Sequence, residues 1–476
     1  METQAPSKER KSQQLSQLHQ SPSISIMDGS HTQLHQKTFT VWTAMGIGHS
    51  ITNTAITLIV GLASGVALGG PPLFIYGFLV MAVIAVCVAI SLGELASALP
   101  HSGGQYFWVA VLAPPKHRRF LSYITGIIGW AGAMGFVGFQ VLNLLAFTFN
   151  CFERVLPWVS RFLLVFTVCT VIIVFVGILA ASPHKQSADN LFVNLYNISG
   201  WSNGVAFLIG LNAPNWAFSC LDATVHLADE IPNPRKNIPQ ALLVTVALGS
   251  ATGLPIILAL FLSAPSVSDI ASSGTPSLQV FQEAFKHNTA AALGFQSLVL
   301  ISAAGAIIGI HTWQSRIAWA FSKDKGFPFH RFLSQIAPEP YGTPVFAHIW
   351  SCCWTSVLGC IYMGSQLAFN SLVSGGILLQ YITYSTCIAC LLWYGRSNIT
   401  PGPFWYPRLG LVSNIVVLLW TAIALVFYCF PSFIPVQAGL MNYVSCVIVG
   451  VSLYALLYWV AFGRKEYETP EPEQYD

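Results

Sequence analysis

The stretch "FLIGLNAPNWAFSCLDATVHLADEIPNPRKNIPQAL" covers residues 207–242 and decides how the chain is read. It begins as an apolar helix, meets Gly210, Pro214 and Asn215, carries Asp222, and then ends in charged residues. An uninterrupted membrane helix would contain none of these residues. The stretch is therefore either a surface helix with a loop or a membrane helix that is interrupted.

Composition favours the membrane helix. Of the 476 residues, 54% are hydrophobic and 8% are charged, whereas about a quarter of a typical soluble domain is charged. We therefore predict an all-α integral membrane protein. Most of the eleven cysteines lie in uncharged runs, where we expect them to pack as small apolar side chains. We expect no cofactor, no metal site and no nucleic-acid partner.

Long uncharged runs predict the membrane helices. The runs without Asp, Glu, Lys or Arg are 38–93, 120–152, 340–395 and 409–463. A membrane helix needs about 20 apolar residues, so three of these runs each hold two helices and a turn. The expected turns are "GGPP" (69–72), "MGSQ" (363–366) and "FPSFIPVQAG" (430–439). Two further helix pairs are expected at 162–183 with 203–226 and at 238–264 with 288–315.

The basic residues predict the orientation. If each pair of helices crosses and returns, 19 of the 21 Lys and Arg residues fall on one side, and only Lys185 and Lys286 lie on the other. By the positive-inside rule that side is cytoplasmic, and both termini are inside. The chain then divides into a disordered cytoplasmic tail (1–37), a membrane domain (38–463) and a cytoplasmic C-terminal tail (464–476).

The run 120–152 does not fit this topology. It is 33 residues long and lies between two basic loops. A helix of that length spans about 50 Å, too long for one crossing, and two crossings need about 40 residues and a turn. The chain thus has eleven apolar segments where the charges require an even number. The run is a re-entrant segment, a tilted helix that inverts part of the topology, or a helix pair without its middle.

Two of the membrane segments contain polar and small residues in mid-span. One is the opening stretch, and the other is "WTAMGIGHSITNTAITLIVGLASG" (42–65). An unwound helix frees backbone N–H and C=O groups, which a membrane tolerates only where they line a cavity or meet a ligand. Two interrupted helices in corresponding positions of two halves predict the binding site of a transporter.

Several motifs resemble, in the same order, those of the amino acid-polyamine-organocation superfamily. "WAFSCLDATVHLADEIPNPRKNIPQAL" (216–242) resembles its broken sixth helix and the acidic loop that follows. "SLGELASALPHSGGQYFW" (91–108) resembles the end of its second helix, and "SRIAWAFSKDKGFP" (315–328) resembles its eighth. With "SITNTAITLIVGLASG" (50–65) and "GGPPLFIYG" (69–77), these motifs are most similar to the fungal amino acid/choline transporter family. The similarity covers about residues 38–465.

That resemblance implies twelve helices, the first ten of them in a five-plus-five inverted repeat with two broken helices. Only four apolar segments precede the broken "NWAFSCLDA" helix (215–223), where the repeat needs five. Residues 120–139 resemble the third helix and 140–158 the end of the fourth. The third and fourth helices are therefore shortened or fused, with several tens of residues absent near Phe139–Gln140. A wrong gene model, a splice form and a true deletion are the alternatives.

The candidate substrate contacts lie at the two interruptions. No Lys or Arg lies deep in a span, so we expect backbone dipoles of the first break to bind the polar or carboxylate end of a solute. The second break would hold the cationic end against aromatic and acidic side chains. The candidates are Gly46, Gly48, Ser50, Ile51, Thr52 and Asn53 in the first break, and Trp216, Phe218, Ser219, Cys220 and Asp222 in the second.

Glu94, Asp222 and His49 are candidates for proton coupling or gating, because an ionisable side chain inside a membrane is a functional hypothesis by default. Each has a structural alternative. Asp222 either meets a substrate ammonium or a proton, or it caps the unwound segment or pairs with a neighbouring helix. Glu94 either carries a proton or holds a loop or gate, and His49 either relays a proton or forms a polar contact in the cavity wall. Arg316 is expected to anchor the cytoplasmic boundary.

The resemblance implies a fungal permease that imports a small amino acid or amine, such as gamma-aminobutyric acid or choline, by proton-coupled alternating access across the plasma membrane. A vacuolar or other internal membrane is the alternative location. A non-transporting nutrient sensor and a transport-incompetent truncated permease are the alternative functions. No protease or hydrolase motif supports an enzyme. The exact substrate, the coupling ion and the oligomeric state stay open.

Overall fold

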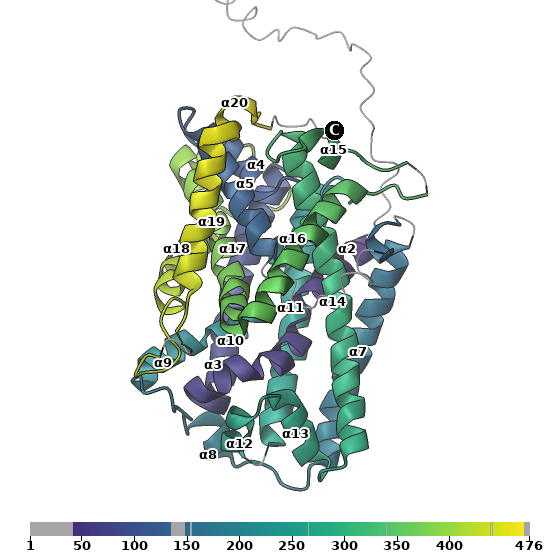
Figure 1. Ribbon diagram of the computed structural model, residues 1–476, viewed down its shortest axis with the longest axis vertical. Helices are drawn as coiled ribbons and strands as arrows, with labels where there is room; N and C mark the ends of the chain where they lie inside the picture. Colours follow the sequence, from purple (N-terminus) through teal and green to yellow (C-terminus); the bar gives the residue numbers. More distant parts are fainter. Residues whose placement is uncertain are drawn as a thin grey trace, which may run out of the picture. The chain divides into compact units, whose positions relative to one another are not determined.

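The computed structural model describes residues 41–134, 148–152, 155–264, 266–338, 340–437, 439 and 441–470. Every regular element in these ranges is helical (Figure 1). The predicted all-α membrane fold is therefore confirmed. The predicted N-terminal tail (1–37), the gap at Phe139–Gln140 and the last residues of the C-terminal tail lie outside the described residues.

Within these described ranges, eight helical stretches are long and apolar enough to cross a membrane. The longest, Ala44–Ala98, contains 55 residues. Its backbone leaves the helical conformation at Gly70 (φ 60°, ψ −148°), directly before two prolines, so this stretch forms two crossings. The turn expected at 69–72 is confirmed. The elements of the bundle are α2 (Val41–Thr52), α3 (Thr54–Ala98), α5 (Arg118–Met134), α7 (Leu156–Ala181), α9 (Asn203–Gly210), α10 (Asn212–Trp216), η1 (Leu221–Leu227), α11 (Pro234–Leu262), α14 (Thr289–Lys323), α16 (Val345–Gly364), α17 (Gln366–Tyr394), α18 (Pro407–Phe427) and α19 (Val444–Tyr458).

The other two predicted turns are also confirmed. Ser365 is extended between α16 and α17, and its hydroxyl caps the second helix by accepting a hydrogen bond from the Ala368 amide at 3.2 Å. α18 ends at Phe427 and α19 begins at Val444, so the irregular segment between them contains the turn expected at 430–439.

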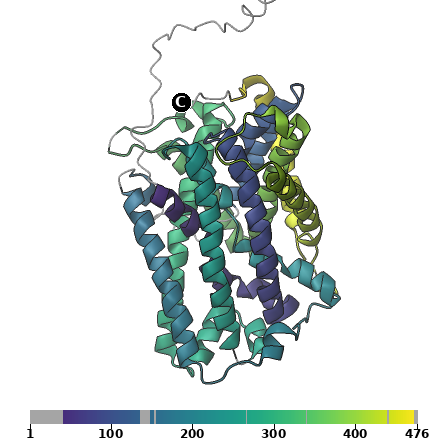
Figure 2. The ribbon, with the colours of Figure 1, turned by 180° about the vertical axis from the view of Figure 1, so that it is seen from behind.

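Short helices lie at the two ends of the bundle (Figure 1). At one end are α8 (Ala188–Phe192), α12 (Val267–Ser272) and α13 (Pro276–Ala284); at the other are α4 (Gln105–Leu112), α15 (His330–Leu333) and α20 (Arg464–Glu466). We call the second the basic end, because the loops with most of the described Lys and Arg residues lie there. α3, α11 and α7 run side by side through the bundle (Figure 2).

The start of the C-terminal tail packs against the basic end. The Tyr467 side chain is buried, and its hydroxyl lies 2.7 Å from the Ser122 hydroxyl of α5. The Glu468 amide donates a hydrogen bond to the Asp324 carbonyl at 3.0 Å, at the end of α14. The first residues after α20 are thus part of the folded domain.

Both described ends of the run 120–152 lie at the basic end. Arg119, at the start of α5, donates a hydrogen bond to the Tyr467 carbonyl at 2.7 Å. The Cys151 carbonyl accepts one from the Thr343 hydroxyl at 3.2 Å, just before α16 begins. The described part of α5 has 17 residues, or about 25 Å of helix. The conflict that the charges predicted therefore persists in the structure, because the run starts and ends on one side.

Candidate binding site at the two broken helices

The first helix break is confined to Asn53. Residues 41–52 form the continuous helix α2, and Asn53 then adopts a left-handed conformation (φ 41°, ψ 48°) before α3 begins. Its side-chain amide donates a hydrogen bond to the Ser302 carbonyl of α14 at 3.1 Å. The prediction that the interruption starts at Gly46 is wrong. The polar residues before Asn53 keep the helix because a hydroxyl can bond back to it, as Thr52 does to the Gly48 carbonyl at 2.9 Å.

The second break is where the sequence predicts it. α10 ends at Trp216, the chain turns through Ala217–Cys220, and a 3₁₀ helix, η1, follows. Cys220 is left-handed (φ 64°, ψ 23°). Its amide donates a 3.4 Å hydrogen bond to the Gln380 side-chain oxygen of α17. A side chain from another helix thus replaces a hydrogen bond that the interrupted helix cannot make.

The two breaks meet on one face of α11. A Cβ atom on Gly48 of α2 would lie 2.7 Å from the Thr245 hydroxyl of α11 and 2.9 Å from the Thr224 methyl of η1. A Cβ atom on Gly249, one turn further along α11, would overlap the Thr54 hydroxyl and lie 3.5 Å from the Phe218 ring. Residues from both interruptions therefore contact the same stretch of α11.

Six buried polar atoms gather around the first break without a hydrogen-bond partner in the described chain. α2 and the start of α3 contribute four of them, α11 one and α14 one. They are His49 Nδ1, Ser50 Oγ, Asn53 Oδ1, Thr54 Oγ1, Thr245 Oγ1 and Ser302 Oγ. A buried polar atom left unpaired costs about 1–3 kcal/mol, so a group of six needs an explanation such as water or a ligand.

The other candidates from the sequence have packing roles. A Cβ on Gly46 would lie 3.5 Å from the Leu164 side chain of α7, and Ile51 packs against Gly309 of α14. The Phe218 ring packs against Phe78 in a tilted arrangement, with 5.0 Å between ring centres. The Ser219 hydroxyl donates to the Asn215 carbonyl at 3.3 Å. Trp216 is half-buried beside the second break.

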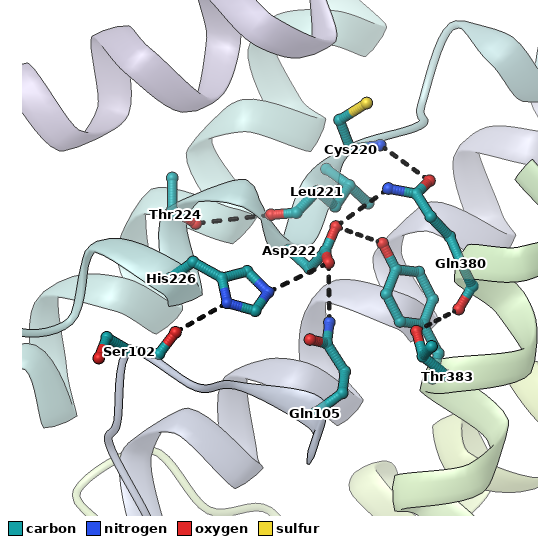
Figure 3. A network of polar contacts seen from close by, with 10 residues as sticks. Ser102, Gln105, Cys220, Leu221, Asp222, Thr224, His226, Gln380 and Thr383 are labelled. Atoms are coloured by element: carbon teal, nitrogen blue, oxygen red, sulfur yellow. Dashed lines mark hydrogen bonds and ion pairs between the residues drawn. The ribbon is translucent and has the colours of Figure 1, made fainter. Parts of the chain in front are cut away.

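Asp222 lies at the centre of a buried polar network (Figure 3). Its Oδ1 accepts hydrogen bonds from the Tyr384 hydroxyl at 2.6 Å and the Gln380 amide at 3.3 Å, both on α17. Its Oδ2 accepts one from the Gln105 amide of α4 at 2.8 Å and lies 3.6 Å from His226 Nε2. In this conformation the Asp222 carboxylate pairs with neighbouring helices. This agrees with the structural alternative that the sequence offered for Asp222.

The turn between α3 and α4 holds this network in place. His226 Nδ1 lies 2.8 Å from the Ser102 carbonyl. Gly104 has a positive φ of 55°, and a Cβ there would lie 2.7 Å from the His226 ring, so the position needs glycine. Burial lowers the pKa of His101 to about 4. Its neutral ring accepts a 2.8 Å hydrogen bond from the Gly103 amide, which shapes the turn that presents Gln105.

Sequence reasoning missed three members of this network: Gln105, Gln380 and Tyr384. All three are neutral. Gln105 lies within the quoted motif 91–108, which does not indicate its partner, and the segment around Gln380 and Tyr384 has the pattern of a plain apolar helix. A glutamine inside an apolar run could have indicated such a contact, because amide side chains in membranes hydrogen-bond across helices.

Two buried ion pairs lie nearer the basic end. Arg396 holds both Glu94 oxygens at 2.8 and 3.0 Å, and the Tyr406 amide donates to Glu94 at 2.7 Å. Glu94 thus holds the segment that follows α17, which was one of its predicted roles. Arg316 pairs with Glu230 at 2.8 Å, and both are buried. The expectation that Arg316 anchors the membrane boundary is wrong, because it lies well before the end of α14 and a buried charge needs a partner.

Comparison with known proteins identifies the family. The family model described as amino acid permease matches residues 39–153 and 141–453. The chain belongs to the amino acid permease family. It is 41% identical to a swainsonine transporter of Arthroderma benhamiae, over 92% of this chain and 93% of the relative. It is 36% identical to the choline transporter of Saccharomyces cerevisiae (92% and 84%) and 24% identical to the GABA-specific permease of that yeast (91% and 83%).

These alignments bear on the missing segment. The two family matches overlap at 141–153, so those residues align twice with the permease model. The alignment with the Arthroderma transporter has 467 positions, yet 92% of 476 residues is about 438. About 29 positions of that permease therefore face no residue of this chain. The absence of residues near Phe139–Gln140 stays a prediction, and the overlap of the two family matches falls directly after that position.

The Asp222 network predicts a specific energetic coupling. The variants Asp222→Asn and Tyr384→Phe should show a coupling of about 0.5–3 kcal/mol in a double-mutant cycle, because their side chains share a buried hydrogen bond. The measurement is the free energy of unfolding in mixed micelles. Tyr381→Phe is the matched control, since its hydroxyl donates to Asn215 rather than to Asp222. Equal coupling for both tyrosines would contradict the assignment.

The contact between the two breaks predicts different costs for two glycines of α2. Gly48→Ala should destabilise the permease by about 1–3 kcal/mol, because the added carbon meets two threonine side chains closer than van der Waals contact. Gly46→Ala should be close to neutral, since its nearest neighbour is at 3.5 Å. Thermal unfolding of the purified protein measures both. A greater cost at Gly46 would be inconsistent with η1 and α11 lying against Gly48.

Proposed function

We propose that this permease imports a small amine-containing solute by alternating access, with a proton as the coupling ion, and that the solute binds at the first helix break. This proposal rests on the six buried polar atoms around Asn53 that have no hydrogen-bond partner in the described chain. Five different residues in it offer a hydroxyl or amide oxygen, and none is charged. A neutral polar group of a solute, or its carboxylate, would supply the missing hydrogen bonds.

Of the two yeast relatives, the more similar one favours a choline-like solute over gamma-aminobutyric acid. Identity to the yeast choline transporter is 36%, against 24% to the GABA-specific permease. Choline carries one hydroxyl and one permanent positive charge. Its hydroxyl would bond to the side chains at the first break.

We assign Asp222 to closure of the path toward the basic end. It joins η1 to α4 and α17, and the pairs Glu94–Arg396 and Glu230–Arg316 join further elements at the same end. Opening toward that end requires these contacts to separate together. A proton on Asp222 would weaken its hydrogen bonds from Gln105 and Tyr384, so protonation would favour opening. By the positive-inside rule we assign this end to the cytoplasm, and we propose the plasma membrane as the location.

Removal of a hydroxyl from the proposed site separates an effect on solute binding from an effect on folding. Thr245→Val removes a buried hydroxyl that has no partner in the described chain, so the melting temperature should stay unchanged or rise. Choline uptake should nevertheless fall, with KM raised roughly tenfold, the effect of about 1.4 kcal/mol of lost binding. Uptake is measured in yeast without its own choline and GABA permeases, together with surface biotinylation.

Thr252→Val on the same helix is the control, because Thr252 is half-buried and its hydroxyl already bonds to the Leu248 carbonyl of α11. It should leave uptake unchanged. The site at the first break is refuted if Thr245→Val transports like the wild type. A protonophore should abolish uptake, and uptake that persists would remove the proton from the mechanism.

The split family match favours a second candidate function, a permease that reaches the membrane but transports nothing. In that case yeast cells that express the wild-type chain would carry it at the surface but would not take up choline, gamma-aminobutyric acid or an amino acid mixture. A chimera with the segment of the yeast choline transporter that aligns between residues 134 and 148 would then restore uptake. Restoration would establish that the missing segment, and not the helix breaks, limits transport.

A further inference from the structure

A cluster of two histidines and one cysteine lies between α14 and α16, away from the helix breaks. It consists of His311, His348 and Cys352, and one ligand atom from each lies within 4.8 Å of the others. The Cys352 sulfur is 3.8 Å from His311 Nδ1 and 3.8 Å from His348 Nε2. Both rings are buried, and they stand edge-on to each other with centres 5.4 Å apart.

Two helices create this cluster. His348 and Cys352 are four residues apart on α16, so they lie on one face of that helix. His311 comes from α14, one residue before Thr312, whose hydroxyl bonds to the Asn150 side chain. The pattern is invisible in the sequence because 36 residues separate His311 from His348 and no ligand motif connects them.

From this geometry we propose that His311, His348 and Cys352 form a binding site for a soft transition-metal ion, with Cu(I) as the preferred ion. Metal–sulfur bonds of about 2.3 Å and metal–nitrogen bonds of about 2.0–2.1 Å put sulfur and nitrogen about 3.8 Å apart when the bonds meet at 120°. The two observed S–N separations equal that value. A thiol that only formed a hydrogen bond would need one of the two histidine rings, whereas Cys352 lies at the same distance from both.

Charge selects the ion. Binding releases the Cys352 thiol proton to solvent, and the thiolate and the two neutral imidazoles then donate lone pairs to the metal. With Cu(I) the site stays neutral, whereas with Zn(II) it gains one positive charge. Neither α14 nor α16 contains Asp or Glu, and α14 carries the buried Arg316, which pairs with Glu230. An extra positive charge there would be costly in a medium of low dielectric constant.

The ligand types agree with this choice. Thiolate and imidazole are soft and intermediate ligands that suit Cu(I) and Zn(II), whereas Mg(II) and Ca(II) prefer oxygen. His348 lies in the first turn of α16, close to the basic end. A bound ion would join α14 to α16 and hold fixed the helix that also carries Arg316.

The test is a Cu(I) titration of the purified full chain in lipid nanodiscs, without oxygen and with bathocuproine disulfonate as competitor. The wild type should hold one equivalent of Cu(I) that Cys352→Ser loses. His311→Gln and His348→Gln should each bind at least about tenfold more weakly. Cys353→Ser is the matched control, because Cys353 is the neighbouring exposed cysteine of α16. Size-exclusion profiles verify that each variant is folded.

X-ray absorption at the copper edge supplies a second readout that is independent of transport. One sulfur and two nitrogen neighbours would support the site. Equal Cu(I) binding by the wild type and Cys352→Ser would overturn it, as would a copper coordinated by sulfur alone, which would indicate other thiols such as Cys387 and Cys390. A parallel titration with Zn(II) tests the charge argument, and tighter binding of Zn(II) than of Cu(I) would refute the choice of ion.

Discussion

A lipid bilayer offers no hydrogen bonds to the backbone, so every interruption of a membrane helix must be buried against other parts of the protein. This permease interrupts two helices, at Asn53 and at Cys220, and both residues are left-handed. Asn53 is held by the backbone of α14 and Cys220 by the Gln380 side chain of α17. Because each break needs a partner from another helix, both come to lie inside the bundle. They meet there across α11, which both contact.

That arrangement separates two kinds of polar group. Around Asn53, hydroxyls and one imidazole lack partners in the described chain, whereas around Asp222 every carboxylate oxygen has donors. Unpartnered atoms cost free energy in the fold unless something else binds them. Satisfied atoms stabilise the conformation that is present. The first break therefore has the properties of a binding surface, and the second has those of a contact that closes the structure at the basic end.

The sequence predicts most of the fold, because charges are excluded from lipid and thus mark each loop. The kink at Gly70 and the break at Cys220 follow from glycine, proline and polar residues in apolar runs. The extent of the first break does not follow, since Ser50 lies within the continuous helix α2 and Thr52 hydrogen-bonds back to its Gly48 carbonyl. Gln380 and Tyr384 could not be assigned either. Their role depends on which helix faces Asp222, and that contact joins residues about 160 positions apart.

The most direct test of the central claim is a cryo-electron microscopy structure of the permease in lipid nanodiscs with saturating choline. The account predicts ligand density between Asn53 and Phe218, with the hydroxyls of Thr54 and Thr245 within hydrogen-bond distance of it. Density at the basic end beyond Asp222, without contacts to the residues around Asn53, would contradict the claim that the solute binds at the first break.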